Sequence, residues 1–166
     1  DEAFIREAKK IKAVTDKYRV PLLINDNIKV CMAVDAAGVH VGQEDMSAAE
    51  IRKILGPDKI VGVTAKTVDQ AKKAGAEGAD YLGSGAMFGS STKTEAKPMT
   101  LAQFAEIRKA VDVPIVLIGG IDAGNIRELA GSGAQGAAVV SGIFAQEDVE
   151  GAARVLKRLS LEVFPG

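Results

Sequence analysis

The sequence has little of the residue types that carry thiol and zinc chemistry, with one cysteine and one histidine among 166 residues, and it also lacks tryptophan. The single cysteine, Cys31, cannot form an internal disulfide, which agrees with a reducing cytoplasm. Cys31 lies in an apolar helical run, so we expect a buried core residue rather than a nucleophile. His40 lies inside an apolar strand, which favours a packed, hydrogen-bonded side chain over a catalytic base, and one histidine disfavours a zinc site.

An excess of charge of one sign is also missing. The formal net charge is −1, the basic residues are spread along the chain, and aromatic residues make up only 4%. Nothing therefore favours binding to nucleic acid or to a membrane surface. No apolar stretch approaches the ~20 residues of a membrane span, and the opening residues do not resemble a signal peptide. We expect a cytoplasmic protein that acts on small molecules, with assembly into a homo-oligomer left open.

What the chain does have is a short apolar strand pattern that recurs and ends each time in small or polar residues. The six copies are residues 21–26, 39–43, 60–64, 80–84, 115–120 and 136–141. Strands with such continuous apolar runs are typical of a parallel sheet. Helical spacing predicts helices over residues 3–18, 28–36, 47–55, 67–75, 100–111, 123–131 and 148–160. The longest loop is expected over residues 86–99.

Strict alternation of strands and helices allows two architectures, a (β/α)₈ barrel or an open doubly wound sheet. A complete barrel typically takes ~200 residues or more, whereas this chain has 166 and begins with a helix. That helix matches the second helix of a barrel from which the first strand, first helix and second strand are missing. We therefore predict a single α/β domain over residues 1–166, a (β/α)₈ TIM barrel that is incomplete at its N-terminus.

Acidic residues follow the first two predicted strands. Asn25 and Asp26 end the first strand, and Asp45 comes after the second. Neighbouring barrel strands would bring the two carboxylates to the same rim, where a pair suits Mg²⁺ held with waters and phosphate oxygens. The competing interpretation makes Asp26 a turn former and Asp45 the start of a helix. On spacing alone, this competing interpretation is favoured.

Three other segments suit phosphate groups. Gly89-Ser-Ser-Thr-Lys93, in the longest loop, offers hydroxyls and a lysine, although such a loop alone is more often simply solvated. The remaining two, Ile118-Gly-Gly-Ile121 and Val139-Val-Ser-Gly-Ile143, end the last two strands, where barrels commonly bind phosphate through backbone N–H groups. Gly120 would let the backbone approach the phosphate and Ser141 would add a hydroxyl. Tight turns that need glycine are the alternative.

Seven motifs, taken in order, resemble the thiamine-phosphate synthase family from about Phe4 to Leu159. They are Leu23–Asp26, Gly38–Asp45, Gly62–Thr67, Gly78–Gly85, Ser90–Lys93, Ile118–Ile121 and Val140–Ile143. The resemblance implies a TIM-barrel transferase of thiamine biosynthesis. It would condense hydroxymethylpyrimidine pyrophosphate with a thiazole phosphate and release pyrophosphate, with Mg²⁺ as cofactor.

The resemblance also implies residue roles. Asp26 and Asp45 would bind Mg²⁺. Asn25, Thr64 and Lys93 would contact the pyrimidine pyrophosphate and carry the catalysis. The thiazole phosphate would be held by Ser90, Ser91, Thr92, Gly120, Val140 and Ser141. Thr64 stands where a serine is common, which keeps the hydroxyl, and Gly89-Ser90 replaces a Pro-Thr pair.

Two alternative functions stay open. A thiazole tautomerase-like barrel would use a histidine after the third strand, where this chain has Lys66. A noncatalytic remnant would bind a phosphate ligand without turnover. The family's pyrophosphate-gripping Gln-x-Arg-x-Lys segment has no counterpart in these residues, which supports the remnant.

Overall fold

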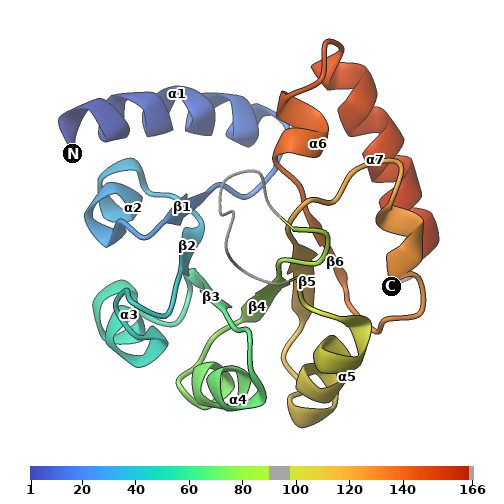
Figure 1. The fold of residues 1–166 in the computed structure, drawn as a ribbon. Coiled ribbons are helices and arrows are strands. Elements are labelled where there is room, and N and C mark those ends of the chain that lie inside the picture. The colour runs from blue at the N-terminus through green and yellow to red at the C-terminus, as the bar shows by residue number, and fades with distance from the viewer. Residues whose placement is uncertain (90–97, 165–166) are drawn as a thin grey trace. The chain divides into compact units, whose positions relative to one another are not determined.

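The computed structural model describes residues 1–89 and 98–164. The chain divides into two compact units, the first made of Asp1–Thr64 and Lys73–Tyr81 and the second of Ala65–Lys72 and Leu82–Gly166. Strands and helices alternate in both units (Figure 1), which confirms the predicted α/β class. None of the helices within the described ranges combines the length and the apolar character that crossing a bilayer demands.

The first unit is built on three parallel strands. Its elements are α1 (Glu2–Lys17), β1 (Leu23–Asn25), α2 (Ile28–Val34), β2 (Gly38–Val41), α3 (Ala48–Leu55) and β3 (Ile60–Thr64). The register places His40 of β2 level with Asn25 of β1 and with Gly62 of β3. Val39 and Val61, level with each other in the register, are fully buried, and α2 and α3 run along one side of the strands (Figure 1). Because side chains alternate along a strand, Asn25 and His40 lie on the opposite face.

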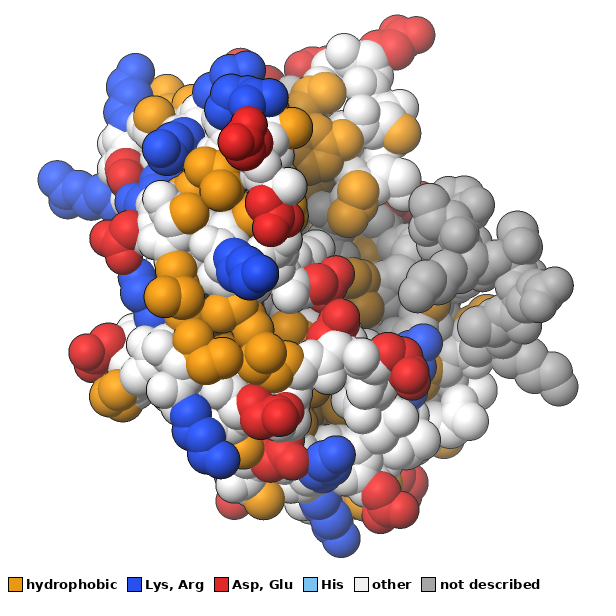
Figure 2. All heavy atoms as spheres, turned by 90° about the vertical axis from the view of Figure 1, so that its left-hand side faces the viewer, with side chains coloured by type: hydrophobic (Ala, Val, Ile, Leu, Met, Phe, Trp, Pro, Cys, Tyr) orange, Lys and Arg blue, Asp and Glu red, His pale blue; other side chains and the backbone are white. Residues whose placement is uncertain are grey.

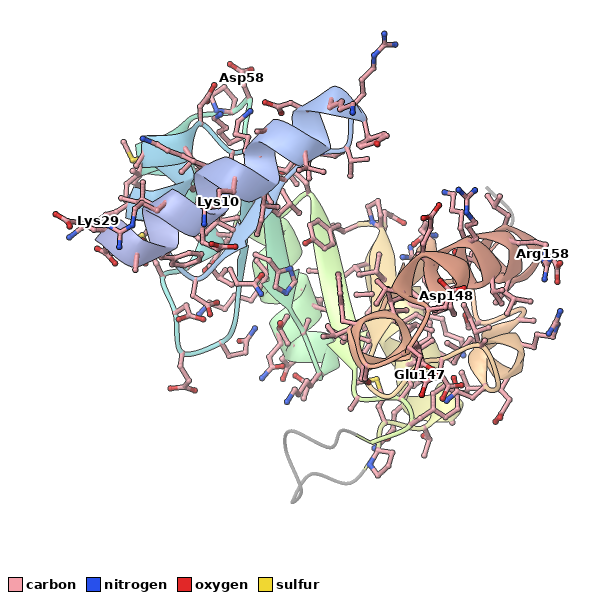
Figure 3. All side chains as sticks on the ribbon, turned by 90° about the horizontal axis from the view of Figure 1, so that it is seen from above. Lys10, Lys29, Asp58, Glu147, Asp148 and Arg158 are labelled. Atoms are coloured by element: carbon pink, nitrogen blue, oxygen red, sulfur yellow. The ribbon has the colours of Figure 1, made fainter. Side chains whose placement is uncertain are left out.

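Helix α1 leaves apolar surface exposed on the first unit. Ala8 is buried, whereas Ile11, Val14 and Tyr18 are 45%, 58% and 67% exposed. Figure 2 shows the face that carries α1 to α3, where hydrophobic side chains gather among acidic and basic ones. The charged residues of this surface extend into solvent, as Lys10 of α1 and Lys29 of α2 do in Figure 3.

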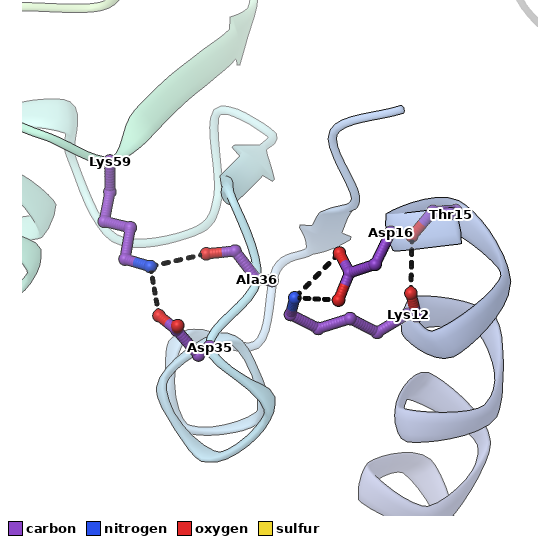
Figure 4. A network of polar contacts seen from close by, with 6 residues as sticks. All are labelled: Lys12, Thr15, Asp16, Asp35, Ala36 and Lys59. Carbon is purple, nitrogen blue, oxygen red and sulfur yellow. Dashed lines mark hydrogen bonds and ion pairs between the residues drawn. The ribbon is translucent and has the colours of Figure 1, made fainter. Parts of the chain in front are cut away.

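A lysine fastens the start of β3 to the turn between α2 and β2 (Figure 4). Lys59 Nζ donates to Asp35 Oδ1 at 2.5 Å and to the Ala36 carbonyl at 2.8 Å. Asp35 ends α2 in the left-handed region, with φ 50°. The hydrogen bond from Lys59, followed by its charge, holds the pKa of Asp35 below its ordinary value. The turn thus sets where β2 begins relative to β3.

The second unit also contains parallel strands. Its elements are β4 (Tyr81–Gly85), α5 (Leu101–Ala110), β5 (Ile115–Ile118), the 3₁₀ helix η1 (Ile126–Leu129), β6 (Gly136–Ala138), α6 (Ser141–Phe144) and α7 (Val149–Val163). Helix α4 (Val68–Ala76) and strand β4 contribute residues to both units. β5 pairs with β4 and with β6. Leu82, Phe104 and Leu117 are fully buried in its core.

The helix starts follow their sequence signals. Ser47 begins α3 with a capping box to Glu50, and Thr100 begins α5 with one to Gln103. In each box the cap hydroxyl accepts the backbone N–H three residues on, while the later side chain accepts the N–H of the cap residue. The predicted starts at these two helices are therefore confirmed to within one residue.

The helix predicted over residues 123–131 is wrong. Only the single 3₁₀ segment η1 forms there. The Asp122 carboxylate accepts the N–H groups of Gly124 and Asn125 at 2.7 and 3.1 Å, which closes a side-chain turn instead of a helical one. The segment ends at Leu129, and the chain then turns at Gly131, with φ 74°. The apolar residues have helical spacing, but the Asp122 carboxylate accepts the backbone N–H groups that would start a regular helix.

Candidate functional site at the strand ends

Two carboxylates meet beyond the ends of β1 and β2 in the first unit. Asp26 directly follows β1 in the left-handed region, with φ 63°, and its N–H donates to the His40 carbonyl at 2.9 Å. Asp45 Oδ2 accepts the N–H of Gly42 at 2.7 Å, which turns this carboxylate back toward the end of β2. The structure thus brings together the two acids that the sequence singled out.

The proximity of Asp45 affects the pKa of Asp26. The pKa of Asp26 is raised above its ordinary value. Desolvation by burial is the largest cause, followed by the charge of Asp45 and a hydrogen bond with its side chain. A divalent cation would relieve this repulsion. Among the described residues no group of three or more histidine, cysteine, aspartate or glutamate side chains could hold a metal. A pair of carboxylates nevertheless fits Mg²⁺, which commonly takes one or two carboxylates and completes its shell with waters and phosphate oxygens.

The only histidine lies in a hydrogen-bonded chain on the same face as Asn25. His40 Nδ1 is 2.8 Å from the Tyr81 hydroxyl, and its Nε2 is 3.0 Å from Thr64 Oγ1. The imidazole is half-buried, and this burial lowers the pKa of His40 below its ordinary value. The expected packed, hydrogen-bonded histidine is confirmed. Its partner Thr64, at the end of β3, is a residue to which the resemblance gives a substrate contact.

A glutamine holds the loop after β2 against the end of β3. Gln43 Nε2 donates to the Thr64 carbonyl at 2.5 Å. Asn25 lies exposed at the end of β1, level with His40. The amide of Asn25 and the hydroxyl of Thr64 therefore lie at the carboxyl ends of their strands, as do Asp26 and Asp45. Such positions bind ligands in parallel α/β proteins.

The second unit carries the predicted phosphate-binding glycine and hydroxyl on adjoining loops. Gly120 follows β5 with φ 65°, and a Cβ there would lie 2.6 Å from the Gly89 carbonyl oxygen. Glycine is thus required at this position by the chain's own backbone. Ser141 and Val140 lie exposed at the start of α6. The loops that follow β5 and β6 lie against each other. A Cβ on Gly142 would be only 2.6 Å from the Ile121 carbonyl oxygen.

The remaining predicted site residues, Ser90, Ser91, Thr92 and Lys93, lie outside the described residues. The roles of all the predicted residues stay predictions. The sequence reasoning did not single out Tyr81 as a partner of His40. One signal was available: Gly62 interrupts a strand, and a glycine inside a strand often marks a close approach of other groups.

Parallel strands that carry polar side chains at their carboxyl ends define an α/β protein in which the strand-end loops are the candidate site. Within this class, the chain belongs to the family described as Thiamine monophosphate synthase, which it matches over residues 1–143. It is 45% identical over 160 residues to Thiamine-phosphate synthase of Clostridium beijerinckii, covering 96% of this chain and 77% of that protein. It is 48% identical over 161 residues to Thiamine-phosphate synthase of Ruminiclostridium cellulolyticum, covering 97% and 75%.

Solved structures agree with this assignment. Thiamine phosphate pyrophosphorylase from Pyrococcus furiosus is similar with a TM-score of 0.89 and 33% identity, over 98% of this chain and 78% of that one. A 3-Hexulose-6-Phosphate Synthase is similar with a TM-score of 0.72 and 17% identity, over 93% and 80%, which bears on the fold alone. The family resemblance seen in the motifs is therefore confirmed.

Proposed function

We propose that this protein is a thiamine-phosphate synthase: it condenses hydroxymethylpyrimidine pyrophosphate with a thiazole phosphate, giving thiamine phosphate and pyrophosphate. Family membership over residues 1–143 is the observation that carries the proposal. Two relatives that share 45% and 48% identity with this chain bear the name of this synthase. The free, buried Cys31 agrees with action in the reducing cytoplasm.

The finer architecture is part of the same proposal. The six described strands would be the last six of a (β/α)₈ barrel, with α1 as its second helix. The similarity to the Pyrococcus furiosus structure, of which the match covers 78%, supports this assignment. In such a barrel the strand ends gather at one rim, which is where active sites of the fold lie.

The first step breaks the bond between the pyrimidine methylene carbon and the pyrophosphate oxygen, and the electron pair leaves with the pyrophosphate. The pyrimidine ring can stabilise the cation that remains, and the thiazole nitrogen supplies the electron pair of the new C–N bond. No nucleophilic side chain is needed. What the protein must supply is electrostatic stabilisation of the leaving group and the positioning of two substrates.

Asp26 and Asp45 would hold Mg²⁺, which when bound supplies positive charge to the departing pyrophosphate. Asn25 and Thr64, at the ends of β1 and β3, would orient the pyrimidine substrate. Lys93 would add positive charge to the leaving group. Gly120 and Ser141, on adjoining loops of the second unit, would bind the thiazole phosphate through backbone N–H groups and a hydroxyl.

The test is formation of thiamine phosphate from the two substrates by the intact protein, followed together with binding of each substrate alone. Turnover that requires both substrates is the expected result. Binding of a phosphate ligand without product would instead favour a noncatalytic binding protein. Conversion of the thiazole phosphate in the absence of the pyrimidine substrate would favour a tautomerase.

A further inference from the structure

The hydrogen-bonded chain Tyr81–His40–Thr64 has a direction that follows from its chemistry. A neutral imidazole has one nitrogen that donates and one that accepts. Burial lowers the pKa of His40 below its ordinary value, which favours the neutral imidazole. A phenol is a stronger donor and a weaker acceptor than an alcohol, which favours donation from the Tyr81 hydroxyl to Nδ1, 2.8 Å away, over the reverse direction. The imidazole proton is then on Nε2, which donates to Thr64 Oγ1 at 3.0 Å.

This direction decides what Thr64 can offer to a ligand. A threonine hydroxyl has one hydrogen and two lone pairs. Because one lone pair accepts the His40 Nε2 proton, the hydroxyl hydrogen remains available. In the opposite tautomer, the Thr64 hydroxyl would donate its one hydrogen to Nε2 and would present only lone pairs to a ligand. Those lone pairs would repel a pyrophosphate oxygen or a ring nitrogen.

The strand is built to accommodate this chain of side chains. A Cβ on Gly62 would lie 2.2 Å from Tyr81 Cζ and 2.5 Å from His40 Nδ1. The two rings meet over this glycine with their centroids 5.4 Å apart. Glycine in a strand interior weakens the strand, so its presence marks a close approach that any larger residue would block. The contact between Tyr81 and His40 therefore depends on the absence of a side chain at Gly62 of β3.

We infer that Tyr81 and His40 are positioning residues that orient the Thr64 hydroxyl as a hydrogen-bond donor toward an acceptor atom of the bound pyrimidine pyrophosphate. The inference rests on the proposed function for the identity of the ligand. The order of the protons within the chain of side chains does not depend on that function: it rests on the two distances and on the stronger donor character of a phenol than of an alcohol. Tyr81 and His40 act through Thr64, and neither needs to touch the substrate.

The first test reads the tautomer directly. The chain has one histidine, so ¹⁵N-labelled imidazole gives one pair of ring-nitrogen resonances without any assignment problem. At neutral pH the intact protein should show Nε2 protonated and Nδ1 as acceptor. The Tyr81→Phe variant, which keeps the ring and removes the donor, should lose this preference. Protonation at Nδ1 in the unmodified protein would overturn the inference whatever the activity.

The second test is a double-mutant cycle on turnover. Tyr81→Phe should lower kcat/KM for the pyrimidine substrate about three- to tenfold, the worth of one hydrogen bond. In a Thr64→Val background, which lacks the hydroxyl, Tyr81→Phe should have no further effect, whereas in a Thr64→Ser background its effect should persist. Tyr18→Phe is the matched control, because Tyr18, which directly follows α1, is 67% exposed.

The outcomes separate this inference from the function on which it rests. An unmodified protein without synthase turnover but with Nε2 protonated would contradict the function and leave the proton order intact. Turnover with an equal effect of Tyr81→Phe in the Thr64→Val background would sink the positioning role. An effect on folding rather than on positioning would lower the thermal midpoint of Tyr81→Phe in proportion to its loss of turnover, and that result also counts against the inference.

Discussion

At the scale of single residues, the charge of Asp26 is the feature with the clearest consequence. Asp26 and Asp45 repel each other where they meet, and the pKa of Asp26 is raised by desolvation and by that neighbour. Asp26→Asn keeps the shape and removes one anionic ligand of the proposed Mg²⁺. The Mg²⁺ concentration for half-maximal turnover should rise about tenfold or more, which corresponds to ~1.4 kcal/mol.

The control for this prediction is Asp58→Asn. Asp58, labelled in Figure 3, is exposed and precedes β3. Asp26 follows β1, so the two residues belong to opposite ends of parallel strands. Its substitution should leave the Mg²⁺ dependence unchanged. If Asp26→Asn behaves like Asp58→Asn in a magnesium titration of turnover, the carboxylate pair is not the metal site.

His40 makes the stability of the protein depend on pH in a defined direction. Burial lowers its pKa in the folded state below the ordinary value of 6.5. As the pH falls through 6.5, the unfolded chain takes up the proton first, so the free energy of unfolding decreases until the folded pKa is reached. Urea unfolding between about pH 7 and pH 5 should show a smaller decrease for His40→Gln than for the unmodified protein. Equal decreases in the two proteins would contradict this prediction.

Two glycines in the second unit allow a matched comparison of strain and contact. Gly120 and Gly131 both adopt positive φ, 65° and 74°. A Cβ on Gly120 would lie 2.6 Å from a backbone oxygen, whereas nothing lies within 4 Å of one on Gly131. Gly131→Ala should therefore cost only the strain of about 1 kcal/mol. Gly120→Ala should cost more and should also weaken binding of the thiazole phosphate, as measured by calorimetry.

This comparison has a clear contrary outcome. If the dissociation constant of the thiazole phosphate is the same in Gly120→Ala as in the unmodified protein, while stability drops, then Gly120 serves only the fit of its loop to the Gly89 backbone. The phosphate would then bind elsewhere.

At the scale of elements, one arginine joins α3 to the segments that precede β3 and β4. Arg52 Nε donates to the Gly78 carbonyl at 2.9 Å, and its Nη1 donates to the Lys59 carbonyl at 2.5 Å. Its Nη2 forms an ion pair with Asp80. Asp80 in turn accepts the N–H of Val61 at 2.7 Å. The Arg52 guanidinium, a planar group with several donors, thus links α3 to the segments that lead into β3 and β4.

Arg52→Lys keeps the charge but not the fork of donors. It should lower the free energy of unfolding by about 1 to 3 kcal/mol, because carbonyls that now accept from Arg52 lose their partner. Chemical denaturation measures the loss. Arg158→Lys, on the exposed side of α7 (Figure 3), is the control and should change stability little. A loss of equal size in both variants would argue against the special role of Arg52.

At the scale of the whole molecule, exposed apolar surface is the feature with a measurable consequence. Phe4, Ile11 and Val14 are 42%, 45% and 58% exposed on α1, and β1 is paired along one edge only within its unit. Free strand edges and apolar helix faces promote association. A polypeptide of residues 1–166 alone should therefore self-associate and show little turnover.

Adding the strand, helix and strand that precede these elements in a complete barrel, in cis or as a separate fragment, should suppress association and raise turnover. Light scattering coupled to size exclusion and the synthase assay measure the two effects. A monomeric polypeptide of residues 1–166 with full turnover would refute the incomplete-barrel proposal.

The sequence by itself determined the local features of this protein. The order of strands and helices, the capping boxes at Ser47 and Thr100, and the burial of Cys31 all depend on residues within a few positions of one another. The same spacing misled over residues 123–131, where Asp122 binds the backbone donors that a helix would need. Propensity alone does not rank two competing hydrogen-bond patterns.

The tertiary structure decided which distant residues meet. Tyr81 and His40 are 41 positions apart and meet because the strand register brings them together over Gly62. Asp26 and Asp45 meet because one follows β1 and the other is turned back to Gly42 by a hydrogen bond. A sequence pattern records which faces of an element are apolar, whereas register and loop geometry determine which side chains lie within hydrogen-bonding distance.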